Sequence, residues 1–219
     1  MNSRVRRIVD LALTIPVIVA LAPLYVIVAI VIKVSDRGPV LFRQERIGKS
    51  GRPFFLLKFR SMRQNSQSVQ VTAGDDERIT RVGRLLRRTK IDELPELWNI
   101  VRGEMALVGP RPEVPRYVDM QDPLWQEALE YPPGVTDPAT LRLRNEEELL
   151  LKILGDRESF YRESLLPWKL RAYAAYGRRR TLWTDILVLV KTILAVVWPA
   201  SCRPTPELLH ELHLARRRE

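Results

Sequence analysis

An apolar run over residues 11–32 constrains the fold of this chain more than any other feature. Apart from Thr14 it has almost no polar side chain, and its length is about what a helix needs to cross the hydrocarbon core of a bilayer. Pro16 and Pro23 interrupt it, and a proline inside a helix removes a hydrogen bond and bends or breaks the helix. The run therefore predicts a membrane-embedded helix–break–helix.

Both flanks of this run are basic, with Arg4, Arg6 and Arg7 before it and Lys33 and Arg37 after it. Positive charge near the ends of a membrane segment favours the cytoplasmic side, so both ends are expected there. A re-entrant segment over residues 1–36, which enters one leaflet and returns, satisfies that demand. A kinked transmembrane helix is the alternative. A signal peptide is disfavoured because the run is long and lacks a small-residue cleavage site.

The composition indicates an anionic partner, because 36 Lys and Arg stand against 26 Asp and Glu, a net charge of +10. Phosphates, nucleotides, nucleic acid and acidic lipids all fit that charge. The single cysteine, Cys202, excludes an internal disulfide and fits a reducing compartment. His210 and His213 share a charged tail and predict no zinc site, which leaves an oxygen-ligated cation such as Mg²⁺.

The remaining pattern predicts an α+β fold that is mostly helical. Residues 40–42 and 53–59 read as a β-hairpin, followed by a polar surface loop over 60–76 and a basic amphipathic helix over 79–86. Further helices are expected over residues 122–130, 146–154, 157–176 and 182–198. The last is apolar enough to lie in a membrane interface, or it is a core helix. We expect a catalytic domain over 37–200 and a basic, partly helical tail over 201–219.

An acidic pair, Asp92 and Glu93, opens another predicted helix. Pro95 is tolerated only in a first turn, so this helix is expected to begin near Asp92, and Gly103 is a natural stop. The apolar residues at helical spacing, expected to form its buried stripe, are Leu94, Leu97, Trp98 and Val101. The positive end of the helix dipole would keep Asp92 ionised, as a nucleophile or metal ligand must be. The alternative is a structural role, in which Asp92 caps the helix and Glu93 complements the dipole.

Basic side chains gather along the sequence near this pair: Lys58, Arg60, Arg81, Arg84, Arg87, Arg88, Lys90 and Arg111. Arginine forks match phosphate oxygens, and the turn that holds Arg111 is stiffened by a proline on each side. Carboxylates, a cation and arginines together can perform phosphoryl transfer. The chain has neither a Walker-type loop nor a Rossmann fingerprint, and it offers no plausible Ser/His/Asp set. The alternative for the arginines is a face that binds lipid headgroups.

A series of motifs in fixed order now gives a family resemblance. They are residues 38–42 (GPVLF), 44–48 (QERIG), 58–62 (KFRSM), 78–84 (RITRVGR), 92–99 (DELPELWN) and 107–113 (LVGPRPE). With the proline-interrupted N-terminal run, they make the chain resemble the bacterial sugar transferases, also called monotopic phosphoglycosyl transferases, over nearly its whole length.

The resemblance implies transfer of a sugar-1-phosphate from a UDP-sugar to polyprenol (undecaprenyl) phosphate, with release of UMP, as the first step of glycoconjugate synthesis. By the same resemblance Asp92 is the nucleophile that takes the phosphosugar covalently, and Glu93 with Asp92 holds Mg²⁺. Arg87 would lie near the lipid phosphate. Lys58, Arg60 and Arg111 would contact the donor phosphates or shape the pocket. The enzyme would be monotopic on the bacterial inner membrane, with its catalytic domain in the cytoplasm.

The chain departs from the family pattern at residues 133–138. Many relatives carry PGITGW there, whereas this chain reads PGVTDP. Arg142 and Arg144, just beyond, are the candidates for contact with the nucleotide. A homodimer is left open, and nucleic acid is not expected as a partner because no recognisable binding motif accompanies the charge. The functional alternative is a non-catalytic basic adaptor that binds acidic lipids.

Overall fold

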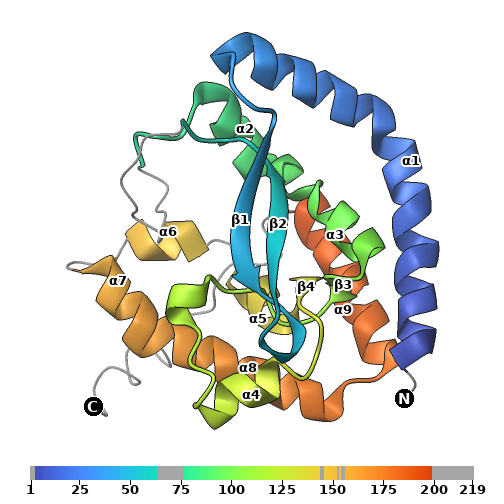
Figure 1. The fold of residues 1–219 in the computed structure, drawn as a ribbon, viewed down its shortest axis with the longest axis vertical. Helices are drawn as coiled ribbons and strands as arrows, with labels where there is room; N and C mark the ends of the chain where they lie inside the picture. The colour runs from blue at the N-terminus through green and yellow to red at the C-terminus, as the bar shows by residue number, and fades with distance from the viewer. Residues whose placement is uncertain (1–2, 64–75, 144–145, 152, 154–155, 199–219) are drawn as a thin grey trace.

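The structure is a computed structural model that describes residues 3–63, 76–143, 146–151, 153 and 156–198 (Figure 1). Its helices are α1 (Ser3–Asp36), α2 (Arg81–Thr89), α3 (Glu96–Arg102), α4 (Pro123–Ala128), α5 (Pro138–Arg142), α6 (Glu146–Leu151), α7 (Arg157–Phe160), α8 (Leu166–Arg179) and α9 (Leu182–Val197). Its strands are β1 (Leu41–Ile47), β2 (Pro53–Phe59), β3 (Ala106–Val108) and β4 (Gly134–Thr136). The mostly helical α+β prediction is therefore confirmed.

The first helix, α1, continues through both Pro16 and Pro23. The predicted break into two helices is therefore absent. Figure 1 shows instead one helix that bends along one edge of the molecule. Each proline removes only its own N–H donor, so the flanking turns stay helical while the axis bends. Among the described helices, α1 alone is long and apolar enough to cross a membrane, by length and composition.

Both halves of α1 are attached to the rest of the protein. Near the start, Arg7 donates to the carbonyl of Val101 (2.8 Å), and Asp10 accepts from the amide of Leu107 (3.3 Å). In the second half, the Tyr25 hydroxyl donates to the carbonyl of Leu94 (2.5 Å). An apolar cluster continues this attachment and contains Val28, Ile32, Phe59 and Leu86. The two halves of α1 are therefore bound to one and the same folded unit.

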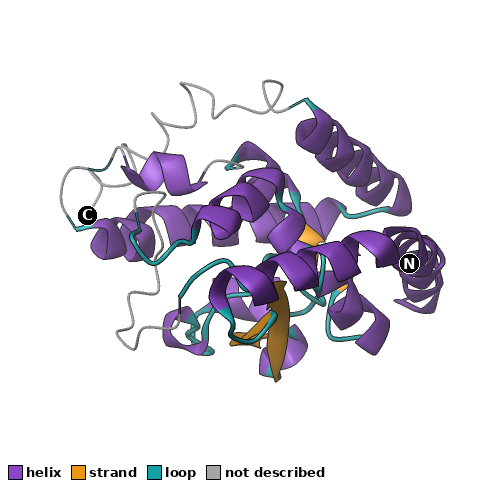
Figure 2. Ribbon diagram, turned by 90° about the horizontal axis from the view of Figure 1, so that it is seen from above, coloured by secondary structure: helices purple, strands orange, loops and turns teal. Residues whose placement is uncertain are grey.

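The hairpin is confirmed as an antiparallel pair, β1–β2, with Leu41 opposite Phe59 and Ile47 opposite Pro53. A second sheet, which the sequence did not predict, pairs β3 with β4 in parallel. Figure 2 shows the β1–β2 hairpin at one side of the molecule and the second sheet as a small patch among helices. In agreement, β1 is largely exposed. A larger apolar core joins α4, α5, α7 and α8 around Trp125, Leu165 and Tyr173.

The four predicted C-terminal helices are present with shifted bounds, as α4, α6, the stretch from α7 to α8, and α9. Most of the predicted loop, residues 64–75, and the predicted tail, residues 201–219, lie outside the described residues. The predicted basic helix is α2, which begins with a Thr80 cap and ends two residues before Ile91.

The buried face of α3 differs from the predicted apolar stripe. Its buried residues are Glu96, Asn99 and Ile100, whereas Trp98 is 45% exposed. The polar face is buried because it binds backbone. Asn99 accepts a hydrogen bond from the Leu57 amide (3.0 Å) and donates one to the carbonyl of Phe55 (2.8 Å). Asn99 therefore fixes α3 to the edge of β2.

Asn99→Leu, which keeps the branched shape of the side chain but is larger and forms no hydrogen bond, is expected to destabilise the fold by about 2–4 kcal/mol, since two backbone groups of β2 lose their partners. Urea unfolding in detergent measures the change. The matched control is Arg102→Gln, at an exposed position of the same helix, which should unfold at the wild-type urea concentration. A midpoint for Asn99→Leu equal to that of the wild type would contradict this role.

Candidate active site

The acidic pair lies in a 3-10 turn, Ile91–Glu93, between α2 and α3. Lys90 adopts a left-handed conformation (φ 60°) that reverses the chain after α2, and Pro95 precedes the first residue of α3. The helix thus begins later than the predicted start at Asp92. Neither the turn nor α3 has a side-chain cap, so the interpretation of Asp92 as a helix cap is wrong.

A cluster of opposite charges surrounds this turn and brings together residues from β2, α3 and the turn that follows β3. The Lys58 ammonium lies 3.0 Å from Glu93 Oε1 and 3.3 Å from Glu96 Oε1. The Arg111 guanidinium lies 2.6 Å from the same oxygen of Glu93. We call Lys58, Asp92, Glu93, Glu96 and Arg111 the carboxylate cluster.

Glu93 is the ionised centre of this cluster. Burial opposes its ionisation, but the charges of Arg111, Lys58 and Lys90 outweigh burial and hold the pKa of Glu93 well below its usual range. The pKa of Glu96 is shifted the other way. Burial raises it, and the positive charge of Lys58 offsets only part of that rise. The two carboxylates that share Lys58 therefore differ in their tendency to hold a proton.

Asp92 is 6% exposed, and its Oδ1 atom is buried without a hydrogen-bond partner. Burial raises the pKa of Asp92 and the neighbouring Glu93 carboxylate raises it further, while Lys58, Lys90 and Arg87 lower it in part. The expectation that a helix terminus stabilises the charge of Asp92 is therefore wrong: α3 begins too late, and desolvation dominates. A desolvated carboxylate oxygen with no partner is more basic, and more reactive once ionised.

The structure brings some of the predicted site residues together and places others elsewhere. Lys58 and Arg111 belong to the carboxylate cluster, and Arg87 at the end of α2 is close enough to lower the pKa of Asp92. Arg60 lies against Gly38, two residues after α1, where its guanidinium occupies the space next to the glycine. Arg142 lies 5.3 Å over the ring of Trp168 instead. Arg144 lies outside the described residues.

Two features were missed from the sequence. Glu96 was read only as part of a motif, although its position three residues after Glu93 places both on one side of the turn and helix. The second is a buried network behind the Arg111 turn. Its centre is Glu113, which accepts from the ammonium of Lys169 (3.0 Å) and from the hydroxyl of Tyr161, and lies 3.7 Å from Arg46. These partners are too distant along the chain for spacing to reveal them.

A divalent cation is compatible with these residues. The described residues contain no group of three or more His, Cys, Asp or Glu side chains suited to a metal. Mg²⁺, however, is typically held by one or two carboxylates together with substrate phosphates. Asp92 offers a buried oxygen without a partner, and the ion pairs found for Glu93 all fall on Oε1. One hard oxygen donor from each residue fits that pattern.

A comparison with family sequence models decides the relationship. Residues 1–199 match the model described as "Bacterial sugar transferase". The chain belongs to this family.

Named relatives of this sugar transferase agree with that assignment. A Komagataeibacter xylinus protein named "Undecaprenyl-phosphate glucose phosphotransferase" is 38% identical over 86% of this chain and 35% of its own length. The Caulobacter vibrioides "UDP-glucose:undecaprenyl-phosphate glucose-1-phosphate transferase" is 34% identical over 86% of this chain and 68% of its own length. The "Exopolysaccharide production protein ExoY" of Sinorhizobium fredii is 32% identical over 87% of this chain and 84% of its own length. The sugar transferase described here thus spans less than half of some relatives and most of others.

Proposed function

We propose that this sugar transferase moves a sugar-1-phosphate from a UDP-sugar to polyprenol phosphate through a covalent intermediate on Asp92. The observation that carries the proposal is the buried, unpartnered Oδ1 of Asp92, on which the charges of Lys58, Lys90 and Arg87 act. Relatives with printed names of this activity support the choice of substrates. UMP and a polyprenol-diphosphate sugar would be the products, and they would start a glycoconjugate or exopolysaccharide.

The chemistry would proceed in two displacements. The Asp92 carboxylate attacks the phosphorus that bears the sugar, the bond from that phosphorus to the bridging oxygen breaks, and UMP leaves with the electron pair. An oxygen of the polyprenol phosphate then attacks the same phosphorus and releases Asp92. Lys58 and Arg111 would neutralise charge on the departing phosphate, and Arg87 would face the incoming lipid phosphate. Asp92 and Glu93 would hold Mg²⁺, which would neutralise the diphosphate when bound.

We further propose that α1 is re-entrant and that the enzyme is monotopic, with its catalytic domain on the cytoplasmic side of the inner membrane. The attachment of both halves of α1 to one folded unit supports this topology, because a span would place one end across the bilayer from that unit. Exposed apolar side chains on α1, on α9 and at the residue that follows α9 supply the membrane contact; they include Val19, Val34, Trp183, Ile193 and Trp198. A homodimer stays an open part of the proposal.

The test of the function uses protein in nanodiscs with polyprenol phosphate and a panel of UDP-sugars. We expect Mg²⁺-dependent release of UMP with at least one UDP-sugar and the formation of a polyprenol-diphosphate sugar. Salt-sensitive binding to acidic vesicles without any UMP release would instead favour a membrane adaptor.

The topology is tested by cysteine labelling in a Cys202→Ser background. Ser3→Cys and Ser35→Cys lie at the two ends of α1, and both positions are exposed. An impermeant maleimide added to right-side-out and inverted vesicles is expected to label both only from the cytoplasmic side. Labelling from opposite sides would contradict the re-entrant helix.

The acid limb of the pH–rate profile should report Asp92, since only its ionised form can attack phosphorus. Burial raises the pKa of Asp92, so activity is lost as the pH falls through that raised value. Lys90→Gln removes a charge that lowers this pKa, and we expect the acid limb to move to higher pH. Arg88→Gln, which changes an exposed cation of α2, is the matched control and should leave the limb unmoved. Identical profiles for Lys90→Gln and the wild type would contradict this assignment.

A further inference from the structure

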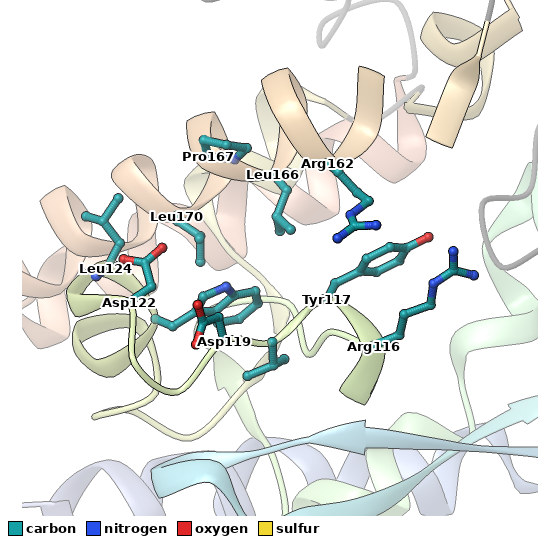
Figure 3. A pocket seen from close by; sticks show the side chains of 11 residues that line it. Arg116, Tyr117, Asp119, Asp122, Leu124, Arg162, Leu166, Pro167 and Leu170 are labelled. Carbon is teal, nitrogen blue, oxygen red and sulfur yellow. Dashed lines mark hydrogen bonds between the residues drawn. The ribbon is translucent and has the colours of Figure 1, made fainter. Parts of the chain in front are cut away.

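A cavity of about 240 Å³ lies between α4, α8 and residues 116–119, and no residue of the carboxylate cluster lines it (Figure 3). Its apolar wall comes from α4 and α8 and contains Leu124, Trp125, Leu166 and Leu170. Trp125 is only 5% exposed, so its ring is a fixed part of this wall. The carboxylates of Asp119 and Asp122 also line the cavity, and each accepts a hydrogen bond from a nearby backbone amide. The cavity thus offers a mainly apolar surface to a ligand smaller than a typical drug.

The polar end of this cavity contains a buried hydroxyl that the folded chain does not satisfy. Tyr117 is 8% exposed, and its hydroxyl has no hydrogen-bond partner. Figure 3 shows this hydroxyl at the end of the pocket where Arg116 and Arg162 approach. A buried donor without an acceptor is costly, and a ligand oxygen that reached it would supply the missing partner.

Two arginines flank this hydroxyl. Arg116 lies over the Tyr117 ring (5.8 Å to its centre) and pairs with Glu158. Arg162 is exposed, and the described part of the chain provides no ion pair for it. Both are long, exposed side chains that can reorient toward an anion at little cost. Their guanidinium groups match the oxygens of a phosphate.

The backbone at Arg162 departs from an ordinary helix. Residues Tyr161–Leu165 form a π-helical turn between α7 and α8. Pro167, which follows, has no N–H to donate to the carbonyl of Glu163, so the regular ladder is interrupted here. Turns of this kind recur at functional sites. Here the turn carries Arg162 at the rim of the cavity.

We propose that this cavity is a second ligand site, which binds a small soluble phosphate monoester with an apolar body. The phosphate binds Arg162, Arg116 and the Tyr117 hydroxyl, and the apolar body lies against Trp125 and Leu170. The site is separate from the carboxylate cluster and does not depend on the function proposed for it.

Titration calorimetry on the full chain in phosphatidylcholine nanodiscs tests the site, with phenyl phosphate as the probe. We expect phenyl phosphate to bind at least about tenfold more tightly than inorganic phosphate, because its ring buries apolar surface. Arg162→Ala should weaken binding about tenfold or more, and Tyr117→Phe about three- to tenfold. Arg171→Ala, an exposed arginine of α8 outside the cavity, is the matched control and should bind like the wild type.

Three results would overturn the proposal. Equal affinity for phenyl phosphate and inorganic phosphate would show that the apolar wall does not contribute to binding. Unchanged binding in Arg162→Ala and Tyr117→Phe, or loss of binding in Asp92→Asn, would place the ligand elsewhere. Loss of binding in phosphatidylglycerol nanodiscs would show that a lipid headgroup, and not a soluble ester, is the ligand. Since Asp92→Asn should keep this binding, failure of the proposed transferase activity would leave the test intact.

Discussion

Asp92→Asn is expected to lower UMP release from the UDP-sugar by at least about 10³-fold, since loss of a covalent nucleophile removes the first displacement altogether. The amide retains the size of the carboxylate but cannot attack phosphorus. Single-turnover measurement with a radiolabelled UDP-sugar gives the rate. Glu130→Gln, a carboxylate-to-amide change at an exposed position of the chain, is the matched control and should retain full activity.

The same substitution should stabilise the fold at neutral pH. The pKa of Asp92 is raised in the folded state, so its protonated form favours folding and this contribution is lost as the pH rises through the folded pKa. Asparagine is neutral at every pH, and the variant should therefore melt at a higher temperature than the wild type at pH 7. The difference should vanish at acid pH. A variant that is inactive because it is unfolded would instead melt lower, and this would contradict the catalytic role.

Lys169→Met is expected to have the largest effect on stability. Lys169 is 3% exposed and pairs with Glu113 (3.0 Å) and Glu146 (3.5 Å). Removing one partner of a buried ion pair costs about 3–5 kcal/mol, because the remaining charge is left without compensation. For a chain of this size we expect a fall of about 6–20 °C in the melting temperature. Thermal unfolding in nanodiscs followed by circular dichroism measures it.

The pH dependence identifies the cause of this loss. Burial opposes the ionisation of Glu113, but Lys169 and Arg46 outweigh it and hold its pKa below the usual range. Its stabilising contribution is present above the unfolded pKa and is lost as the pH falls through the folded pKa. The difference in melting temperature between Lys169→Met and the wild type should therefore become smaller at acid pH. The double variant Lys169→Met/Glu113→Gln should recover part of the lost stability. A difference in melting temperature that is the same at every pH would show that Lys169→Met acts through lost packing and not through the unpaired charge.

The sequence predicted the elements whose signals are local. Two apolar segments on either side of the glycines at 48 and 51 located the β1–β2 hairpin, and Gly103 marked the end of α3, where it adopts φ 82°. The sequence predicted the wrong buried face for α3, because a periodic apolar stripe indicates the buried face only when the polar face of the helix is in water. In the structure Asn99 is buried through its bonds to β2, and Trp98 is left on the outside. The β3–β4 pairing joins two three-residue strands that lie far apart in sequence, which no local pattern reveals.

The candidate site was predictable to the extent that charge and turn chemistry are local. Lys58 and Arg111 stand in turn-bounded, apolar surroundings, and both contact Glu93. Arg142 was a candidate only because it follows the divergent stretch at residues 133–138, and its guanidinium lies over Trp168, a partner 26 positions away. The state of Asp92 depends on its burial, which spacing alone does not give. For that reason the sequence-based expectation for the charge of Asp92 was wrong, while the catalytic role of the pair stays a prediction.

The covalent intermediate is tested most directly by intact-protein and peptide mass spectrometry. Protein in nanodiscs without polyprenol phosphate is incubated with Mg²⁺ and a UDP-sugar that supports turnover, then quenched. We expect a mass increase equal to one sugar phosphate, located on the peptide that contains Asp92, absent in Asp92→Asn and discharged when polyprenol phosphate is added. An active enzyme that shows no adduct under these conditions, or an adduct that persists in Asp92→Asn, would contradict the mechanism.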